Sequence, residues 1–389
     1  RQRDVPQLIL TQNLFGLDID ERAAQLTGFA LMMKGRADDR RLFHRGVKLN
    51  VMALVDSAGF DAEGLANGVE LSDYGLKPGD LTELKQLFEH ATTFGSLIQV
   101  PKGLAARLPA LKQLSETPSQ NLFVSEALKR LGPLVYQAGL LAAQYDAVVA
   151  NPPYIGIKYH TPELKRFLRM NYRGYEKDVF SAFIDRDFQM TKPYGRLGFM
   201  SPFVWMFISS YEVLRVRLIR EETFTSLIQL EYSGFEGATV PICTFTLQKG
   251  HVIGHSGSYI RLSDFKGAQN QKPKTLEAIR NRKCGWFFET VQEEFLAIPA
   301  NPIAYWVSHN VRNLFRKLPS FGEIAHPRVG MQTANNDHFL RLWFEVDLRE
   351  SNIFISHQRN WVAYCKGGSF RRWYGNNMHL LRYKDNGAE

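Results

Sequence analysis

The amino-acid sequence predicts an α/β protein built on a doubly wound sheet. Between residues 14 and 250, short apolar runs alternate with stretches in which apolar residues recur every three or four positions. The run from Ala147 to Ala150 is unbroken, as in a strand that is buried on both faces. Strands that alternate with helices favour a sheet with helices on both faces, and ligands gather beyond the carboxyl ends of such strands.

The elements of this region follow one another in a regular order. Strands are predicted at 14–17, 51–60, 94–100, 145–150, 197–202, 225–232 and 241–250. Helices are predicted at 21–36, 80–91, 102–140, 160–172, 179–191 and 210–222, with Asp80 as a cap and a turn at 192–196. No internal repeat or low-complexity tract interrupts this order.

Composition excludes several classes of protein. With 389 residues, of which 44% are hydrophobic and 12% aromatic, the chain is long enough for two or more packed domains and is not disordered. The three cysteines are far apart, which argues against a disulfide framework or a zinc site and fits a cytoplasmic protein. The sequence has no signal-peptide pattern and no apolar stretch of membrane-spanning length. A net charge of +9 permits a polyanionic partner without requiring one.

The character of the chain changes after Gly250. We expect residues 1–250 to form one domain, 251–301 a polar and basic connector, and 302–389 the start of a second domain. Residues 301–389 contain twelve Lys and Arg against seven Asp and Glu. The basic and aromatic residues that suit phosphate contact and base stacking are Tyr305, Trp306, Lys366, Arg371, Arg372, Trp373 and Tyr374. The same residues also fit a solvated surface with ordinary core aromatics.

The sequence Asn151-Pro152-Pro153-Tyr154 directly follows the apolar strand that ends at Ala150 and resembles a motif of amino-group methyltransferases, whose chemistry explains these residue types. An amino group conjugated to a purine ring is a poor nucleophile, and two acceptors placed out of the ring plane would draw its nitrogen toward tetrahedral geometry. The Asn151 side chain and the Pro152 carbonyl are such acceptors, and consecutive prolines hold the backbone stiffly. Tyr154 offers a flat face to a base. A simple turn at the end of a strand is the alternative, since Asn-Pro and Pro-Pro are common in turns.

This NPPY sequence resembles the catalytic motif of the amino-group S-adenosylmethionine-dependent methyltransferases. The resemblance implies a Rossmann-like class I methyltransferase sheet, S-adenosylmethionine as cofactor and no metal. "GLDID" resembles the strand end whose acid binds the cofactor ribose, which assigns that role to Asp18 and adenine contact to Ile19. "FGSLI" implies adenine contact for Ser96 and Leu97, although Ser96 stands where an acid is common. "DVFSAF" implies cofactor contact for Phe183, and "CTFTL" implies that Phe245 flanks the target base together with Tyr154.

A further resemblance lies beyond the predicted sheet. "VGMQTANNDHFLR", residues 329–341, resembles the entry to the target-recognition region of large adenine methyltransferases, with Ala334 in place of the usual glycine. Together with "NYRGYEKDVFSAF" and "WYGNN", it makes the chain most similar to the PglX-like adenine methyltransferases of BREX phage-resistance systems. The resemblance implies N6 methylation of adenine in double-stranded DNA, with other defence subunits as possible partners. The residues that it assigns to DNA binding are Arg328, Thr333, Asn336, Lys366, Arg371 and Arg372.

The first motif of this family, a glycine-rich loop with a Gly-x-Gly core, has no counterpart here. No two of the thirty glycines are separated by a single residue, and little chain precedes the first predicted strand. We therefore expect a methyltransferase sheet that is truncated at the N-terminus and lacks its first strand, so that the fragment alone binds cofactor poorly.

Three alternatives remain open from the sequence. A release-factor glutamine methyltransferase also uses NPPY, on an amide nitrogen, but is not expected to carry a long basic tail. A non-catalytic DNA-binding or partner-binding defence subunit could keep the pocket without turnover. A fused restriction enzyme would need a nuclease module, and no convincing nuclease motif is visible in these residues.

Overall fold

The computed structural model describes residues 4–232, 234–235, 240–327, 333, 335–351 and 360–384. The chain forms two compact units, residues 1–318 and residues 319–389, which are described separately below. Within the described ranges, every helix is too short or too polar to cross a lipid bilayer.

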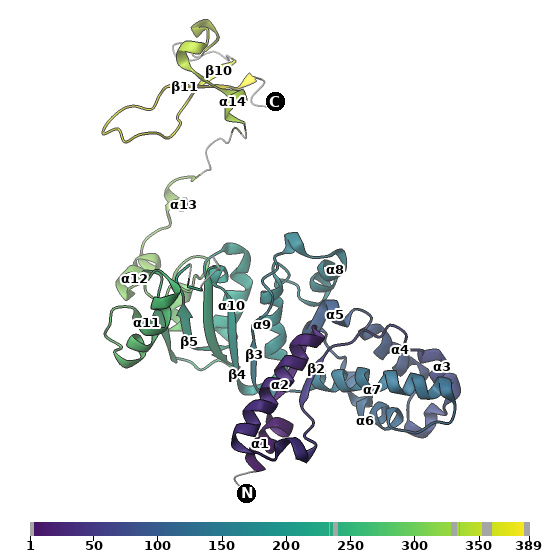
Figure 1. The fold of residues 1–389 in the computed structure, drawn as a ribbon. Coiled ribbons are helices and arrows are strands. Elements are labelled where there is room, and N and C mark those ends of the chain that lie inside the picture. Colours follow the sequence, from purple (N-terminus) through teal and green to yellow (C-terminus); the bar gives the residue numbers. More distant parts are fainter. Residues whose placement is uncertain are drawn as a thin grey trace. The chain divides into compact units, whose positions relative to one another are not determined.

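The first unit contains a six-stranded mixed sheet with strand order β3-β4-β6-β5-β7-β8 (Figure 1). Its strands are β3 (Tyr145–Ala150), β4 (Thr191–Pro202), β5 (Thr223–Gln229), β6 (Ile242–Gln248), β7 (Ser256–Arg261) and β8 (Phe287–Val291). The pairs β3–β4 and β5–β7 are parallel, whereas β6 and β8 run antiparallel to their neighbours. The sheet is mixed because β5 and β6 follow each other without a helix between them in the described residues. Two consecutive strands can pair in parallel only when a long crossover, usually a helix, connects them, so β5 and β6 pair antiparallel.

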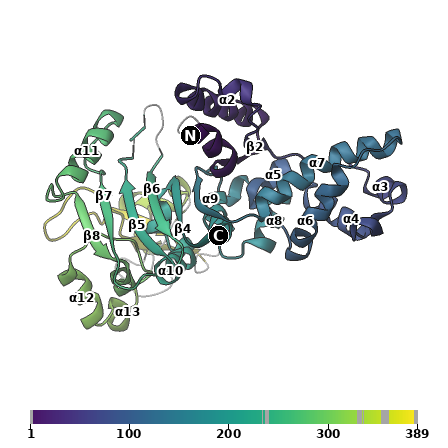
Figure 2. The ribbon, with the colours of Figure 1, turned by 90° about the horizontal axis from the view of Figure 1, so that it is seen from below.

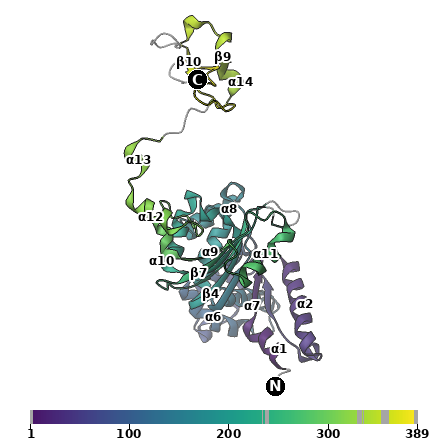
Figure 3. The same ribbon diagram turned by 90° about the vertical axis from the view of Figure 1, so that its left-hand side faces the viewer.

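Helices cover both faces of this sheet. Figures 2 and 3 show α2 and α11 on one side of the sheet and α10 on the other. The helices of this part are α8 (Pro162–Asn171), α9 (Val179–Met190), α10 (Glu212–Glu221), α11 (Ala268–Arg280) and α12 (His309–Lys317), with single turns η6 (Ile157–Tyr159), η7 (Phe203–Met206), η8 (Ser209–Tyr211) and η9 (Gln292–Ala297). The core between the layers is aromatic, and Trp205, Phe224 and Phe245 are among its fully buried side chains. Residues 251–301, for which a connector was expected, contribute β7, α11, β8 and η9 to the same unit.

A separate parallel pair precedes the main sheet. It consists of β1 (Phe15–Asp18) and β2 (Asn50–Ala53), joined by α2 (Glu21–Asp38) and the turn η3 (Leu42–Arg45). The short segments α1 (Val5–Leu8) and η2 (Ile9–Asn13) lead into β1. Asp20 caps α2, because its carboxylate accepts hydrogen bonds from the backbone N–H groups of Arg22 and Ala23.

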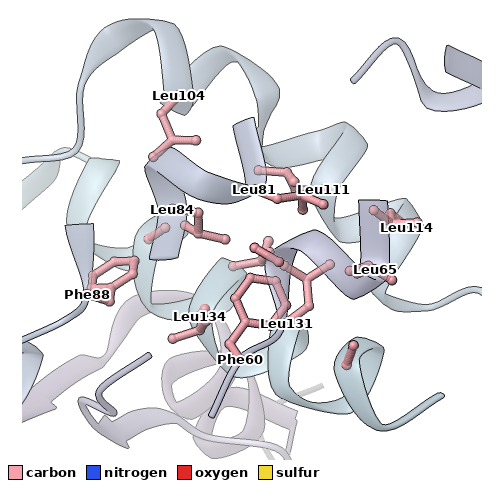
Figure 4. Close-up of a cluster of buried hydrophobic side chains, with 14 of the residues drawn as sticks. Phe60, Leu65, Leu81, Leu84, Phe88, Leu104, Leu111, Leu114, Leu131 and Leu134 are labelled. Carbon is pink, nitrogen blue, oxygen red and sulfur yellow. The ribbon is translucent and has the colours of Figure 1, made fainter. Parts of the chain in front are cut away.

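Helices with a core of their own follow β2. They are α3 (Ala62–Gly68), α4 (Pro78–Leu87), α5 (Ala91–Phe94), α6 (Lys102–Ser115) and α7 (Leu122–Ala142), with the turns η4 (Leu71–Tyr74) and η5 (Gly95–Leu97). Figure 4 shows leucine side chains from these helices meeting Phe60 and Phe88, which lie just outside them, in one buried cluster. Helix α4 begins at Pro78 rather than at Asp80, and the Asp80 carboxylate accepts a hydrogen bond from the backbone N–H of Lys77.

The strand predicted at 94–100 is wrong. Gly95 ends α5 with a φ of 58° and a ψ of −146°, a combination that glycine adopts far more readily than other residues. The chain then makes the single turn η5, and Leu97 and Ile98 are buried beneath it. The apolar residues of this segment therefore fill two cores rather than one pleated face.

The second unit is small. A three-stranded antiparallel sheet of order β10-β11-β9 contains β9 (Leu340–Leu342), β10 (Trp361–Tyr364) and β11 (His379–Arg382). Short helical segments accompany it: α13 (Phe321–Ile324), α14 (Asn336–Phe339), η10 (Trp343–Glu345) and η11 (Leu348–Glu350). Strands β10 and β11 form a hairpin whose long loop, residues 365–378, carries basic and aromatic side chains.

Candidate active site

The NPPY segment lies at the carboxyl end of β3. Ala150 pairs with Phe199 of β4, and the chain leaves the sheet at Asn151. Pro152 is buried, whereas Asn151 and Pro153 are exposed. The Tyr154 side chain is half-buried and packs against the aromatic core of the main sheet. The strand thus delivers the segment to the sheet edge at which ligands usually bind.

Asn151 and Tyr154 contact each other directly. The Tyr154 hydroxyl donates a hydrogen bond of 2.8 Å to Oδ1 of Asn151. Burial raises the pKa of the Tyr154 hydroxyl, so this group stays protonated and remains a donor near neutral pH. The amide oxygen that is expected to accept from a substrate amine is therefore held at the surface and already occupied by a neighbouring hydroxyl. An amide oxygen can accept two hydrogen bonds, so one acceptor position of this exposed oxygen is left for a substrate.

The chain after Tyr154 is fixed to the start of α9. The backbone N–H of Val179 donates to the carbonyl of Ile155 at 3.1 Å, and that of Ile157 donates to the carbonyl of Lys177 at 3.0 Å. A ring nitrogen of His160 lies 2.8 Å from the carbonyl oxygen of Ile155. These contacts hold the segment after NPPY against the "DVFSAF" sequence, which positions Tyr154 from both sides.

Asp178 caps α9 at this junction, because its carboxylate accepts a hydrogen bond from the backbone N–H of Phe180 at 3.3 Å. Burial raises the pKa of the Asp178 carboxyl to about 6, against an opposing effect of its backbone hydrogen bonds. The folded protein thus binds this proton more tightly than the unfolded chain, and stability falls as pH rises through the window from about 4 to 6.

We expect Asp178→Asn to weaken this pH dependence, because asparagine caps a helix without carrying a charge. The midpoint of urea unfolding, measured from pH 4 to pH 7, should fall less steeply in the variant than in the wild-type protein. Identical slopes for the two proteins would show that Asp178 ionises in the folded state as it does in the unfolded chain.

The predicted cofactor residues fall into two groups. Asp18 ends β1 with an exposed carboxylate, and its Oδ1 accepts a hydrogen bond of 2.9 Å from the backbone N–H of Asp20. Ile19 is exposed next to it and lies against Gly95, which brings it close to Ser96. Leu97 is buried, and its side chain packs in one cluster with the half-buried Phe183. Asp18 and Ile19 are exposed, Ser96 and Phe183 are partly exposed, and Leu97 alone of these five residues is buried.

Arg186 is a positioning residue that the sequence analysis missed. From α9, its buried guanidinium donates hydrogen bonds to the carbonyl of Ser96 at 2.9 Å and to the carbonyl of Leu141 at 2.7 Å. Burial lowers the pKa of Arg186, and nearby tyrosines and aspartates oppose this effect. Because it joins η5 to α9, Arg186 fixes the Ser96 backbone relative to the helix that carries Phe183. Nothing in the spacing of "FIDRDF" distinguishes this arginine from a solvated one.

Phe245 lies in the core rather than at the site. Its side chain is 1% exposed, and its ring centroid lies 5.5 Å from that of Phe199 and 5.1 Å from that of Trp205. It has no surface to offer a base. The alternating pattern of "CTFTL" indicates that Phe245 is buried. Cys243, Phe245 and Leu247 share one face of β6, and all three are buried.

The aromatic residues predicted to stack on bases divide in the same way. Tyr305 is buried, donates its hydroxyl to Oε1 of Gln229 at 2.9 Å and stacks on Tyr259. Trp306 packs on the main core with the Arg261 guanidinium over its ring. Trp373 and Tyr374, by contrast, are exposed. The first pair is structural, so only the second pair remains available to a ligand.

The predicted DNA-binding residues belong to the second unit. Arg371 and Arg372 are exposed and Lys366 is half-buried, all in the loop between β10 and β11. Thr333 donates its hydroxyl to the side-chain oxygen of Asn336 at the start of α14. Arg328 lies outside the described residues. Among the residues that the structure describes, no group of three or more His, Cys, Asp or Glu side chains is arranged to hold a metal ion.

An α/β unit that presents an asparagine, two prolines and a tyrosine at a strand end matches a known class of enzyme. Residues 12–235 match the model of the Eco57I restriction-modification methylase family, and the chain belongs to that family. The adenine-specific methyltransferase BrxX of Escherichia coli O9:H4 (strain HS) is 36% identical over 414 residues, which cover 100% of this chain and 34% of BrxX.

Two further relatives agree with this assignment. The adenine-specific methyltransferase PglX of Lacticaseibacillus casei (strain Zhang) is 32% identical over 400 residues, which cover 99% of this chain and 33% of PglX. The type II restriction enzyme and methyltransferase RM.Eco57I of Escherichia coli is 23% identical over 297 residues, 70% of this chain and 28% of that protein. The chain thus spans about a third of the length of the relatives that it matches over its whole length.

Proposed function

We propose that this chain carries the catalytic loop and the first DNA-recognition elements of an adenine-specific DNA methyltransferase of the BREX phage-defence type. The reaction is transfer of a methyl group from S-adenosylmethionine to N6 of an adenine that is extruded from double-stranded DNA, in the cytoplasm. The observation that carries the proposal is the Asn151–Tyr154 pair at the end of β3, in a chain whose relatives are named adenine-specific methyltransferases. Those names do not favour the glutamine methyltransferase alternative.

In this proposal Asn151 and Pro152 bind the target amino group. Oδ1 of Asn151 and the backbone carbonyl of Pro152 accept hydrogen bonds from its two N–H groups, which draws the nitrogen out of conjugation with the purine ring and makes its lone pair available to attack the methyl group. The exposed position of Asn151 and the buried ring of Pro152 support these roles, since one group must reach the base while the other holds the backbone rigid. Pro153 adds a second fixed φ, and the Tyr154 ring stacks on the extruded base.

The cofactor supplies an electrophilic methyl group on its sulfonium sulfur. The residues at the end of β1 fit its polar and apolar parts, because the exposed Asp18 carboxylate can accept from ribose hydroxyls and the exposed Ile19 side chain can cover an adenine face. Ser96 stands next to Ile19 and is held by Arg186. Leu97 is buried beneath this surface, and the half-buried Phe183 beside it keeps its proposed contact with the cofactor.

A further parallel strand completes the methyltransferase sheet between β1 and β3. Each of these strands stands at the end of its own sheet, with β2 or β4 as the described neighbour on one side. The rings of Phe15 and Tyr145, the first residues of β1 and β3, lie 5.2 Å apart between centroids, so the starts of the two strands lie near each other. Val149 of β3 is 83% exposed, although its apolar run is typical of a buried strand. This supports the expectation that the first strand and the glycine-rich loop belong here.

The two units have different roles in this proposal. Residues 1–250 supply the catalytic core with β7, α11 and β8 as its continuation, and the second unit begins the target-recognition region. Its exposed Arg371 and Arg372, with Lys366, Thr333, Asn336 and Arg328, contact the DNA backbone. Other defence subunits are partners of the whole protein.

Methylation-sensitive sequencing of DNA from cells with and without the full-length protein tests the proposed function. A modified adenine in one sequence context, present only when the protein is expressed, is the expected result. Full-length protein that binds the cofactor but labels no DNA with any defence partner would instead identify a non-catalytic subunit. Methyl transfer to a glutamine-containing peptide in place of DNA would identify the other alternative.

Variants of Tyr154 separate its ring from its hydroxyl. Tyr154→Phe keeps the stacking face and frees Oδ1 of Asn151, so methyl transfer should persist. Tyr154→Ala removes the ring and should lower turnover by roughly tenfold to a hundredfold, the value of one base–aromatic stack, while cofactor affinity stays unchanged. A methyl-transfer assay and calorimetry measure the two effects. Loss of cofactor binding without loss of turnover in Tyr154→Ala would contradict this role.

A further inference from the structure

The loop between β10 and β11 has a defined shape. Tyr364 and His379 form the last pair of the hairpin, so residues 365–378 project beyond the three-stranded sheet. Within the loop, the Asn376 side chain donates a hydrogen bond of 3.1 Å to the carbonyl of Ser369. Gly375 and Asn376 have positive φ values of 155° and 61°, which turn the chain back toward β11. This bond closes a smaller loop, residues 370–375, which we call the hairpin tip.

The hairpin tip exposes three large aromatic side chains. Phe370 is 87% exposed, Trp373 is 88% exposed and Tyr374 is 84% exposed. Aromatic rings of this size are normally buried, and exposed apolar side chains gathered in one short loop are typical of a binding surface. Within the described residues these three rings stay largely uncovered, whereas Tyr305 is buried. Something flat and apolar is the natural partner of such a group.

Two cations accompany the rings. Arg371 and Arg372 are exposed between Phe370 and Trp373, and the Arg372 guanidinium lies 5.4 Å from the centroid of the Trp373 ring. An aromatic group flanked by arginines complements nucleic acid, because the rings stack on bases while the cations neutralise the phosphates beside them. A purely apolar protein partner would give these two charges no counterpart.

We propose that the hairpin tip inserts between base pairs of duplex DNA, with Phe370 and Trp373 as the stacking wedge and Arg371 and Arg372 on the flanking phosphates. Apolar and aromatic wedges of this kind unstack a base step and kink the duplex, and the new stacking offsets the unstacking. This inference rests on the proposed function, which supplies DNA as the substrate. It adds an activity, local opening of the duplex, that the catalytic loop does not supply.

The test uses the full-length protein and an unmethylated duplex that contains the sequence this protein methylates. The fluorescent base 2-aminopurine is placed at successive positions of the duplex. Insertion predicts a rise in 2-aminopurine fluorescence at one step, apart from the target adenine. In Phe370→Ala/Trp373→Ala this rise should vanish and DNA should bind about tenfold more weakly or worse, with an unchanged dependence on salt. Arg371→Ala/Arg372→Ala should instead reduce the slope of log affinity against log salt by about 2.

Controls separate insertion from general damage. Phe344→Ala removes an exposed aromatic side chain of the same unit that lies outside the hairpin, and it should bind and distort DNA like the wild type. Trp373→Phe should keep part of the fluorescence signal, because phenylalanine retains a stacking face. All variants should melt at the wild-type temperature, since the altered side chains are exposed.

The outcomes distinguish the inference from the proposed function. Unchanged affinity and fluorescence in Phe370→Ala/Trp373→Ala, with wild-type methylation, would overturn the wedge and leave the methyltransferase assignment intact; the tip would then be a protein contact. A full-length protein that neither binds nor methylates DNA would overturn both.

Discussion

Asn151→Ala in the full-length protein is expected to lose at least about a hundredfold in methyl transfer, because one of the two acceptors of the target amine disappears. Removal of a single group that stabilises a developing charge in a preorganised site typically costs a hundredfold to a thousandfold in rate. DNA affinity should change by less than about threefold, since phosphate contacts supply most of it. Single-turnover methyl transfer and a DNA-binding assay at one salt concentration measure the two effects.

The structure refines this expectation. Oδ1 of Asn151 accepts from the Tyr154 hydroxyl at 2.8 Å, so the variant also frees the tyrosine side chain. The double variant Asn151→Ala/Tyr154→Phe also removes the tyrosine hydroxyl that Asn151→Ala leaves without its partner. It should be no more active than Asn151→Ala. Asn171→Ala is a matched control, because it removes another exposed asparagine of the same unit, at the end of α8. Equal activities of Asn151→Ala and Asn171→Ala would remove the catalytic role from Asn151.

The sequence predicted most strands and helices of the first unit because their patterns are local. Apolar runs before Asp18 and Asn151 became β1 and β3, and the periodic segment at 179–191 became α9. The place of the NPPY segment in the fold could be predicted for a related reason: prolines restrict the backbone wherever they occur. Its place at a strand end depends on neither distant contacts nor partners.

Features that depend on distant contacts could not be predicted in this way. Whether "FGSLIQV" forms a strand depends on which cores receive its leucine and isoleucine, and Gly95 permits a turn that an average propensity does not foresee. The mixed sheet results from how the chain returns between β5 and β6. The hydrogen bonds of Arg186 join segments that lie far apart in the sequence.

The hairpin tip could be predicted only in part. Its composition was visible as "SFRRWYG", but the same composition suits a core, as Tyr305 and Trp306 demonstrate. Only the fold separates exposed aromatics from buried ones, because burial is decided by the elements that pack around a segment. Composition therefore predicted a nucleic-acid surface, and the structure shows which of these side chains are exposed.

Phe245→Ala is expected to destabilise the protein by about 3–5 kcal/mol, the typical loss when a buried phenylalanine is truncated and leaves a cavity. Phe245 packs between Phe199 and Trp205 on the inner face of β6, so its removal opens a space in the centre of the main core. The free energy of unfolding, measured in urea, reports this loss. Any loss of methyl transfer in this variant would follow from unfolding.

A gentler substitution distinguishes a core residue from a base contact. Phe245→Leu keeps most of the apolar volume, so we expect a smaller loss of stability and methyl transfer close to that of the wild type at a temperature where both are folded. A residue that stacked on the extruded base would behave differently, since leucine has no aromatic face. Wild-type stability with strongly reduced transfer in Phe245→Leu would therefore return Phe245 to the site and contradict the core assignment. Burial beneath two aromatic neighbours is the reason to expect the first result.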